Sequence, residues 1–438
     1  MVIMKYKIII FGCQFNYSDA ERLDTVMKKL GYQKAGDKSQ ADLIFVLACS
    51  VRQSAIDRIY GLKKKWDEVH QKRPLITVLS GCVMEKDKKK MAEFFDIILP
   101  ITDLKKLPKL LAEKALELPV DYLELHPSYQ SEFQAYVPIM TGCNNFCAYC
   151  VVPYVRGREV SRPAGEIIKE CRDLIKKGYK EITLLGQNVN SYKSETKSKV
   201  KSQKSKFTIQ KLKVINFPEL LKMIDEIPGD YWLRFVTSHP KDMSDELIRA
   251  MAKSKHLTPY LHLPVQAGDN GILKKMNRRY TVEHYKKLVA KIRKALPGIS
   301  VSTDVIVGFP GETKKEFKNT LKLFKEVKFG MAYTAQYSER SGTAAARLKD
   351  DVPREEKKRR EQELTKVLKK TALEYNKKFL GKTVTVLTEE CKNDYCLGKT
   401  ATFKTAKFTG GSRDLVGKFV KVKLNKAEAF GIGGTLVI

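Results

Sequence analysis

Three cysteines lie close together near the middle of the chain. Cys143, Cys147 and Cys150 have the spacing C-x3-C-x2-C. Thiolates on so short a loop converge on one small volume, where they can hold three corners of an iron–sulfur cube and leave the fourth iron open. The alternatives are a zinc knuckle or three incidental cysteines. Zinc would want a fourth ligand, which neither side of the loop obviously offers, and a disulfide would leave one sulfur over.

Three other cysteines follow predicted strands of the N-terminal region. Cys13, Cys49 and Cys82 come shortly after apolar runs at 7–11, 43–47 and 75–79. In a parallel sheet the carboxyl ends of the strands share one edge, where ligands bind. The pattern therefore predicts a second three-cysteine cluster with its own open iron. Three buried core cysteines are the alternative, because cysteine is often buried.

The elements that must position the N-terminal cysteines alternate along residues 1–126. Helical patterns at 18–30, 53–70 and 86–95 follow the three strands, and a short fourth strand is expected at 97–99. This alternation is typical of an open parallel α/β sheet.

The pattern restarts after Pro127 with six strand–helix repeats. They predict an open, six-stranded relative of the eight-stranded (β/α) barrel. In such barrels the chemistry lies at the carboxyl ends of the strands, and the Cys143 loop follows the first strand. The expected strands are 137–140, 181–185, 232–236, 260–263, 301–307 and 333–337, and the expected helices are 164–177, 217–226, 244–252, 282–295 and 314–327.

A charged helix at 353–378 leads to a region with a period of two. Short strands expected at 383–387, 399–403 and 416–424 predict a small all-β barrel. The resulting domains are 1–126, 127–370 and 371–438. Residues 379–438 hold ten basic and five acidic residues, which favours a nucleic acid partner. Cys391 and Cys396 are interpreted as incidental, and Cys171 as a core residue.

The whole chain of 438 residues carries a formal net charge of +32. RNA is the simplest partner for such a charge, with a generally basic proteome as the alternative. Nine scattered cysteines indicate reduced thiolates in a cytosol. No apolar run approaches the ~20 residues that span a bilayer, so a soluble, cytoplasmic protein is expected.

Two further basic segments carry predictions of their own. Arg156, Arg158 and Arg162 follow the cysteine loop closely, and their position predicts phosphate contact, with a solvated basic face as the alternative. The segment Lys193–Lys213 has eight lysines and one glutamate, and it is interpreted as a flexible insertion that either contacts RNA or does nothing.

The motifs resemble known families. The Cys143 loop, with its Tyr149-Cys150 end, resembles the radical S-adenosylmethionine (SAM) superfamily. The C-terminal region resembles a TRAM domain. Nearly the whole chain is similar to the methylthiotransferases, whose three N-terminal cysteine motifs match Gly12-Cys13-Gln14-Phe15-Asn16, Ala48-Cys49-Ser50-Val51-Arg52 and Gly81-Cys82-Val83.

The resemblance implies an enzyme with two 4Fe-4S clusters. The first, on Cys143, Cys147 and Cys150, would bind SAM and generate a 5′-deoxyadenosyl radical. The second would carry the sulfur that becomes a methylthio group. The segments at the strand ends surround SAM in this family, so Tyr149, Gln187, Ser238 and Gln266 are its predicted contacts. Ordinary loop capping is the alternative for the last three.

The motifs look most like the branch that modifies C2 of N6-isopentenyladenosine at position 37 of tRNA. Alternative substrates within the family are N6-threonylcarbamoyladenosine of tRNA and an aspartate of a ribosomal protein. A non-catalytic, RNA-binding iron–sulfur redox sensor is the alternative of another class. The expected partners are a tRNA anticodon stem-loop and a reductase such as flavodoxin or ferredoxin, with no membrane, and the protein is expected to be a monomer.

Overall fold

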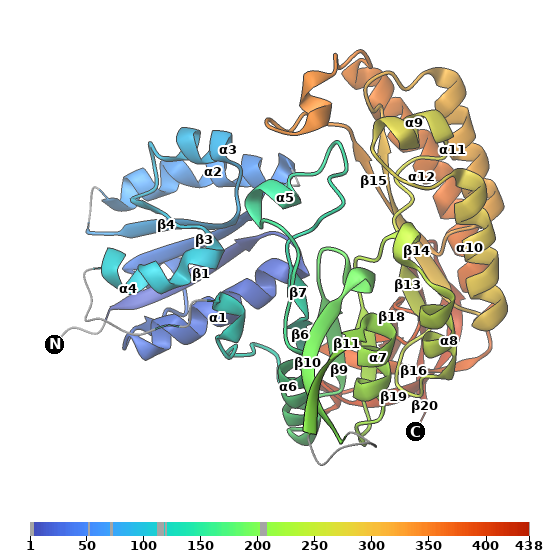
Figure 1. The fold of residues 1–438 in the computed structure, drawn as a ribbon, viewed down its shortest axis with the longest axis horizontal. Coiled ribbons are helices and arrows are strands. Elements are labelled where there is room, and N and C mark those ends of the chain that lie inside the picture. Colours follow the sequence, from blue (N-terminus) through green and yellow to red (C-terminus); the bar gives the residue numbers. More distant parts are fainter. Residues whose placement is uncertain are drawn as a thin grey trace.

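The computed structural model describes residues 4–50, 53–70, 73–111, 118, 121–201 and 208–437. Val51 and Arg52, part of one cysteine motif, lie outside the described residues. Along the chain follow a five-stranded sheet, a partial barrel and a small closed barrel (Figure 1). None of the helices in the described ranges has the length and apolar character needed to cross a membrane.

The N-terminal sheet is parallel and has the strand order β2-β1-β3-β4-β5. The central strand β3 is buried along its whole length, as a strand covered on both faces must be. One apolar core lies on the α1 side and another on the α2 side, which confirms the predicted open α/β sheet. The strands are β1 (Lys5–Phe11), β2 (Gln33–Lys34), β3 (Leu43–Cys49), β4 (Ile76–Cys82) and β5 (Ile97–Ile98), and the helices are α1 (Gln14–Lys29), α2 (Gln53–His70), α3 (Glu85–Met91) and α4 (Leu107–Leu110).

Six parallel strands form the central partial barrel. They make two three-stranded sheets, β12-β9-β6 and β13-β14-β15, which an isolated bridge between Leu233 and Leu257 connects. The prediction of an open six-stranded barrel is confirmed. The strands are β6 (Gln134–Pro138), β9 (Glu181–Leu185), β12 (Trp232–Phe235), β13 (Tyr260–His262), β14 (Ser300–Val307) and β15 (Met331–Gln336).

Amphipathic helices cover the outside of this barrel (Figure 1). Capping side chains define where several of them begin. Thr313, for example, accepts a hydrogen bond from the backbone N–H of Glu316, whose side chain caps in return. Cys171 is buried in α6, as predicted. The helices are α6 (Ala164–Lys176), α7 (Phe217–Asp225), α8 (Asp245–Lys253), α9 (Asn270–Lys275), α10 (Val282–Ala295) and α11 (Lys314–Val327).

The lysine-rich segment differs from its prediction. It forms two antiparallel strands, β10 (Lys193–Lys201) and β11 (Thr208–Asn216), which pair from Lys193 opposite Asn216 to Lys201 opposite Thr208. The interpretation as a flexible insertion was wrong for these strands. Main-chain hydrogen bonds between two strands do not require the apolar face whose absence suggested disorder.

Helix α12 (Arg354–Lys377) leads to a closed barrel with the strand order β16-β17-β18-β20-β19. The small β-barrel is confirmed, but the strand expected at 399–403 is wrong, since β17 ends at Thr400 and Phe403 turns the chain with a φ of 62°. Cys391 and Cys396 face each other across β16 and β17 and form a disulfide, so they are not incidental. The strands are β16 (Thr383–Lys392), β17 (Tyr395–Thr400), β18 (Thr405–Thr409), β19 (Phe419–Ala427) and β20 (Gly431–Val437).

The closed barrel docks at the amino ends of the central strands. The ring of Trp232, the first residue of β12, lies 4.6 Å from that of Phe419, and the guanidinium of Arg234 donates to two carbonyls of residues 400 and 401 at 3.0 Å. The ring of Tyr260, the first residue of β13, lies 4.7 Å from that of Phe403. The C-terminal barrel therefore lies opposite the edge where the chemistry of such barrels takes place.

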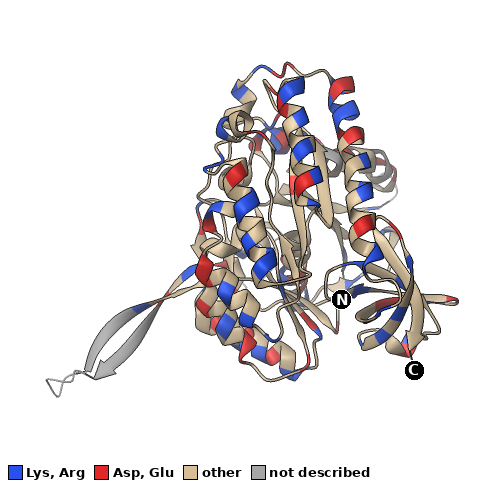
Figure 2. Cartoon of the chain, turned by 90° about the vertical axis from the view of Figure 1, so that its right-hand side faces the viewer, with Lys and Arg blue, Asp and Glu red and all other residues tan. Residues whose placement is uncertain are grey.

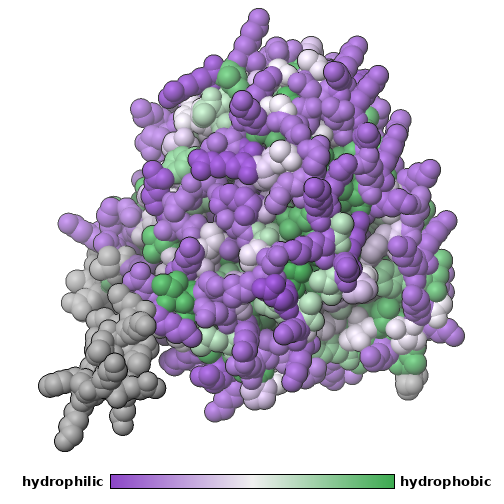
Figure 3. All heavy atoms as spheres, turned by 45° about the vertical axis from the view of Figure 1, so that its right-hand side comes forward, coloured by the Kyte–Doolittle hydropathy of each residue, from purple (hydrophilic) through white to green (hydrophobic). Residues whose placement is uncertain are grey.

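On the sides of the molecule that Figures 2 and 3 show, the surface is largely hydrophilic and basic side chains are spread over the helices. In Figure 2, Lys and Arg dot the outward faces of the barrel helices, with Asp and Glu between them. On the face that Figure 3 shows, apolar side chains are scattered among hydrophilic ones, which is ordinary for a solvated surface. On the helices that Figure 2 shows, the two signs of charge are therefore interspersed rather than gathered into one basic patch.

Candidate active site at the barrel mouth

The three N-terminal cysteines come together at the carboxyl edge of the first sheet. Cys49 and Cys82 are the last residues of β3 and β4, where they lie directly opposite each other. Cys13 follows β1 and begins α1, with its N–H donating to Oδ1 of Asn16 at 3.1 Å. The sequence had placed Cys49 and Cys82 just beyond their strands, and the strands in fact run on to include them. We call these three residues the N-terminal triplet.

Hydrogen bonds among these sulfurs shift the pKa values of the three thiols in different directions. A hydrogen bond from Cys49 lowers the pKa of Cys13 to about 6, although burial opposes the change. Cys49 also lowers the pKa of Cys82, and these two contacts raise its own pKa well above the ordinary value. Cys13 and Cys82 are therefore the thiolate-prone members.

The predicted phosphate contacts of Arg156 and Arg162 are wrong, because both side chains are buried in ion pairs. Arg156 pairs with Asp19, and its Nε donates to Sγ of Cys82 at 2.8 Å. Arg162 pairs with Glu170 at 2.8 Å. Arg158 is exposed, with its guanidinium 4.3 Å from the centroid of the Phe146 ring. Arg158 alone of the three is free to reach a phosphate.

The second triplet lies on the cysteine loop, which we define as residues 142–151. The loop begins after the short strand β7 (Met140–Thr141), which pairs with β8 (Val160–Ser161), and ends at helix α5 (Val152–Val155). Gly142 has a φ of 77°, and a Cβ there would meet the carbonyl oxygen of Arg158 at 2.0 Å. Only glycine fits this approach. We call Cys143, Cys147 and Cys150 the loop triplet.

Main-chain hydrogen bonds on two sides fix the cysteine loop. The N–H of Ala148 donates to the carbonyl of Met276 at 2.9 Å, and its carbonyl accepts from Ala345 at 2.7 Å. Burial and the neighbouring thiols raise the pKa of Cys150 to about 12, and burial raises the pKa of Cys143. Three thiols this close repel one another as thiolates, so a positively charged centre is needed to hold them deprotonated.

Arg278, which contacts the loop triplet, was not predicted from the sequence. Its side chain is buried, with Nη1 donating to Sγ of Cys147 at 3.4 Å and Nη2 to the carbonyl of Pro264 at 2.8 Å. It therefore connects the loop to the segment after β13. An arginine two residues before a tyrosine carries no local signal of this role.

The structure describes no group of three or more His, Cys, Asp or Glu side chains arranged to hold a single metal ion. An iron–sulfur cube places each thiolate on a different iron, so its ligands need not meet at one point. Two features fit bound cofactors. Each triplet has a buried arginine at one sulfur. At the carboxyl ends of the central strands, which we call the barrel mouth, Oε1 of Gln187 is buried without a hydrogen-bond partner. An orphaned buried oxygen is expected where a ligand would satisfy it.

The predicted SAM contacts lie around the same mouth. Tyr149 is partly buried on the cysteine loop and packs against the central core. Ser238 follows β12 and donates to the carbonyl of His262. Gln266, after β13, has a φ of 71°, and its main chain bonds to Asp304 and Ile306. Its side-chain amide has no hydrogen-bond partner in the described residues, which leaves it free for a ligand.

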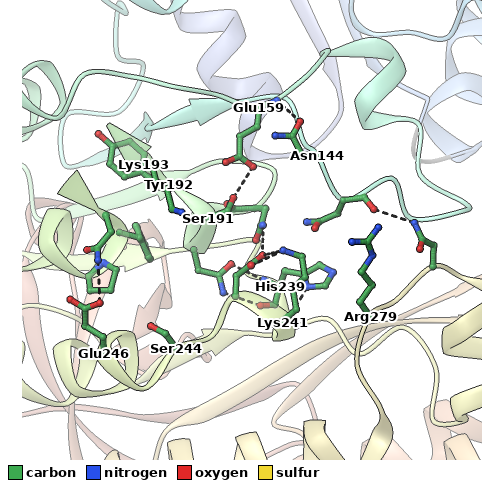
Figure 4. Close-up of a pocket in the computed structure, with 18 residues that line it drawn as sticks. Asn144, Glu159, Ser191, Tyr192, Lys193, His239, Lys241, Ser244, Glu246 and Arg279 are labelled. Carbon is green, nitrogen blue, oxygen red and sulfur yellow. Dashed lines mark hydrogen bonds and ion pairs between the residues drawn. The ribbon is translucent and has the colours of Figure 1, made fainter. Parts of the chain in front are cut away.

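A cavity of about 610 Å³ opens beside the cysteine loop. Figure 4 shows Glu159 hydrogen-bonded to Ser191, at 2.7 Å, and Asn144 beside it. Burial lowers the pKa of His239 to about 2, so this imidazole is neutral. The lining is polar and mixed in charge: Asn144, Asn145, Glu159, Asn188, Asn190, Ser191, Tyr192, Lys193, Asn216, Phe217, Pro218, His239, Lys241, Asp242, Ser244, Glu246, Asn277 and Arg279.

Comparison with known proteins agrees with this geometry. Residues 137–324 match the radical SAM superfamily, and residues 5–100 match the uncharacterized protein family UPF0004. A radical SAM methyltransferase from Kitasatospora setae, whose structure holds cobalamin and a [4Fe-4S] cluster, has a TM-score of 0.55 at 12% identity and covers 79% of this chain and 77% of its own. That likeness supports the fold alone. The two family matches place the chain in the class of radical SAM enzymes, with an added N-terminal α/β unit.

Two relatives match over nearly their whole length. The tRNA-2-methylthio-N(6)-dimethylallyladenosine synthase of Clostridium novyi is 41% identical, covering 99% of this chain and 96% of the relative. That of Carboxydothermus hydrogenoformans is 41% identical, covering 100% of both. The chain belongs to this family of radical SAM methylthiotransferases.

Proposed function

We propose that the protein adds a methylthio group to C2 of N6-dimethylallyladenosine (isopentenyladenosine) at position 37 of tRNA. The observation that carries the proposal is the pair of cysteine triplets, each with a buried arginine at one sulfur. A redox sensor would need no second triplet beside a barrel mouth, nor free amides at the strand ends.

The chain's own residues do three things in this scheme. The loop triplet and Arg278 hold a 4Fe-4S cluster, and Gln187, Gln266, Ser238 and Tyr149 orient SAM beside it. The N-terminal triplet holds a second 4Fe-4S cluster. When bound, a cluster on the loop triplet would supply one-electron reduction of SAM, which is the chemistry that activates an unreactive C–H bond.

The polar cavity of about 610 Å³ supports a nucleotide substrate at this mouth. Lys241 is occupied by Asp242 at 2.6 Å, and the neutral His239 and the asparagines offer hydrogen bonds without a net charge. Such a lining suits base edges better than phosphates. Single-stranded loops, whose bases can be splayed out, are the usual targets of sequence-specific RNA recognition. We assign the cavity to a nucleotide of the anticodon loop.

We propose the following roles for the remaining parts of the chain. Residues 1–126 form the methylthiotransferase domain, 127–370 the radical SAM core and 371–438 a TRAM-like domain that contacts the tRNA stem, away from the mouth. Arg158 contacts phosphate at the mouth. The protein acts as a monomer in the cytoplasm and receives electrons from a reductase such as flavodoxin or ferredoxin.

The experiment uses anaerobically reconstituted protein, SAM, a reductant and anticodon stem-loop RNA. We expect 5′-deoxyadenosine and a methylthio product with the N6-dimethylallyl RNA, and no product with N6-threonylcarbamoyl RNA. Mass spectrometry of the digested nucleosides gives both readings. Intact clusters without 5′-deoxyadenosine would contradict the enzymatic proposal, and product on the threonylcarbamoyl RNA would change the substrate.

A further inference from the structure

Arg156 belongs to the central unit but lies inside the N-terminal site. It follows helix α5, only six residues after Cys150 in the sequence. Its side chain and that of Asp19, its ion-pair partner on α1, are each 1% exposed. A charged side chain this deeply buried is costly unless its environment compensates the charge.

Each of the three guanidinium nitrogens donates a hydrogen bond to a residue of the N-terminal region. Nε donates to Sγ of Cys82 at 2.8 Å, and Nη1 donates to the hydroxyl of Tyr122 at 2.9 Å. Nη2 donates to the carboxylate of Asp19. The ring of Phe15 lies 4.2 Å from the guanidinium carbon. Hydrogen bonds from all three nitrogens and the ring against one face hold the planar guanidinium in a single orientation.

We propose that Arg156 is a positioning residue of the second cluster, supplied to the N-terminal triplet by the central unit. This inference rests on the proposed second 4Fe-4S cluster. The N–H donor and the positive charge of Arg156 act on the Cys82 sulfur. The N-terminal sheet provides the three thiols, and the chain leaving the cysteine loop provides the cation that completes the site.

The physical reason is charge. A cluster held by three thiolates in a dry site carries negative charge that water does not screen. Hydrogen bonds to the sulfurs and the net charge nearby are among the factors that set the reduction potential of an iron–sulfur cluster. One buried guanidinium at a ligand sulfur makes reduction easier, so it raises the potential. The loop triplet has its own arginine, Arg278, at 3.4 Å from Cys147.

The test isolates the second cluster. In a background with Cys143, Cys147 and Cys150 changed to Ala, the full chain is reconstituted anaerobically, its iron is counted, and the potential is measured by an electron paramagnetic resonance titration. Arg156→Met removes the charge and the donors. We expect a more negative potential, or loss of the roughly four irons of one cube. Arg156→Lys keeps the charge but not the fork, and should give an intermediate potential.

The matched control is Arg172→Met, an exposed arginine on α6 of the same central unit, which should leave iron content and potential unchanged. Full iron content and an unchanged potential in Arg156→Met would overturn the role. So would a lower unfolding midpoint with an unchanged potential, because that outcome describes a purely structural arginine. If the background itself binds no iron, the second cluster fails and this role with it, while radical chemistry at the loop triplet is judged separately by 5′-deoxyadenosine formation in the unmutated protein.

Discussion

The loop triplet comes from one short stretch of chain, whereas the N-terminal triplet is collected from the ends of three strands. Cys143 and Cys150 are brought near each other by sequence spacing. Cys49 and Cys82 meet only because β3 and β4 pair in register. A local site depends on the cysteine loop holding its shape, and a distributed site depends on the whole sheet. The two sites should therefore respond differently to the same kinds of damage.

Their acidities differ as well. In the N-terminal triplet, a hydrogen bond from Cys49 lowers the pKa of Cys13 to about 6. In the loop triplet, burial raises the pKa of Cys150 to about 12. Cys13 and Cys82 of the first site favour the thiolate before metal binds, whereas Cys49 of that site and Cys143 and Cys150 of the second must lose their protons when the metal arrives. The two triplets therefore differ in how many of their thiols favour the thiolate before a metal binds.

The largest expected effect separates the roles of the two triplets. Changing Cys143, Cys147 and Cys150 to Ala should abolish 5′-deoxyadenosine formation and reduce iron from about eight to about four per chain. Changing Cys13, Cys49 and Cys82 to Ala should remove the other half of the iron but leave 5′-deoxyadenosine formation in place. Iron analysis and chromatography measure both. Loss of radical formation in the second variant would mean that the sites are not independent.

Thiol alkylation in the cluster-free protein tests the acidities. At pH 7 Cys13 should be largely thiolate, because its pKa is about 6, and Cys150 protonated, because its pKa is about 12. Iodoacetamide should therefore modify Cys13 at least on the order of 100-fold faster. The rate at Cys13 should fall as the pH drops through 6. Mass spectrometry of digests gives both rates, and equal rates would remove the proposed contrast.

Removing the partner of Arg156 should destabilise the distributed site. Asp19→Ala leaves a buried guanidinium without its counter-ion, which costs about 3 kcal/mol of the free energy of unfolding. Chemical denaturation measures this loss. The control is Asp103→Ala, which breaks an exposed pair with Lys106 and should cost less than about 1 kcal/mol. Similar losses in the two variants would show that the pair does little for the fold.

The smallest effect concerns the disulfide-bonded pair Cys391 and Cys396, which lies outside both triplets. Cys391→Ser with Cys396→Ser removes a disulfide that closes a short loop, so the C-terminal barrel should lose about 1–2 kcal/mol. Iron content and 5′-deoxyadenosine formation should stay unchanged, since this barrel docks away from the mouth. Thermal unfolding and iron analysis report the two outcomes. A loss of iron would link these cysteines to a cluster after all.

Much of the fold was accessible from the sequence because period and spacing are local properties. Helix α10 and strand β9 have the predicted bounds, and all six central strands lie within a few residues of prediction. Phe403 was misplaced because the positive φ that ends its strand leaves no trace in an alternating pattern. Charge alone also misled at Arg156, since a basic residue near a nucleotide site suggests solvent-exposed phosphate contact.

The sequence by itself determined the two sets of three cysteines, the alternation of strands and helices, and the family they define. The tertiary structure alone decided which buried arginines donate hydrogen bonds to the cysteine sulfurs. Arg156 reaches Cys82 across 74 residues of chain, and Arg278 reaches Cys147 across 131. No local pattern records such contacts, because they arise only when separate elements pack and force a buried charge to find its partner.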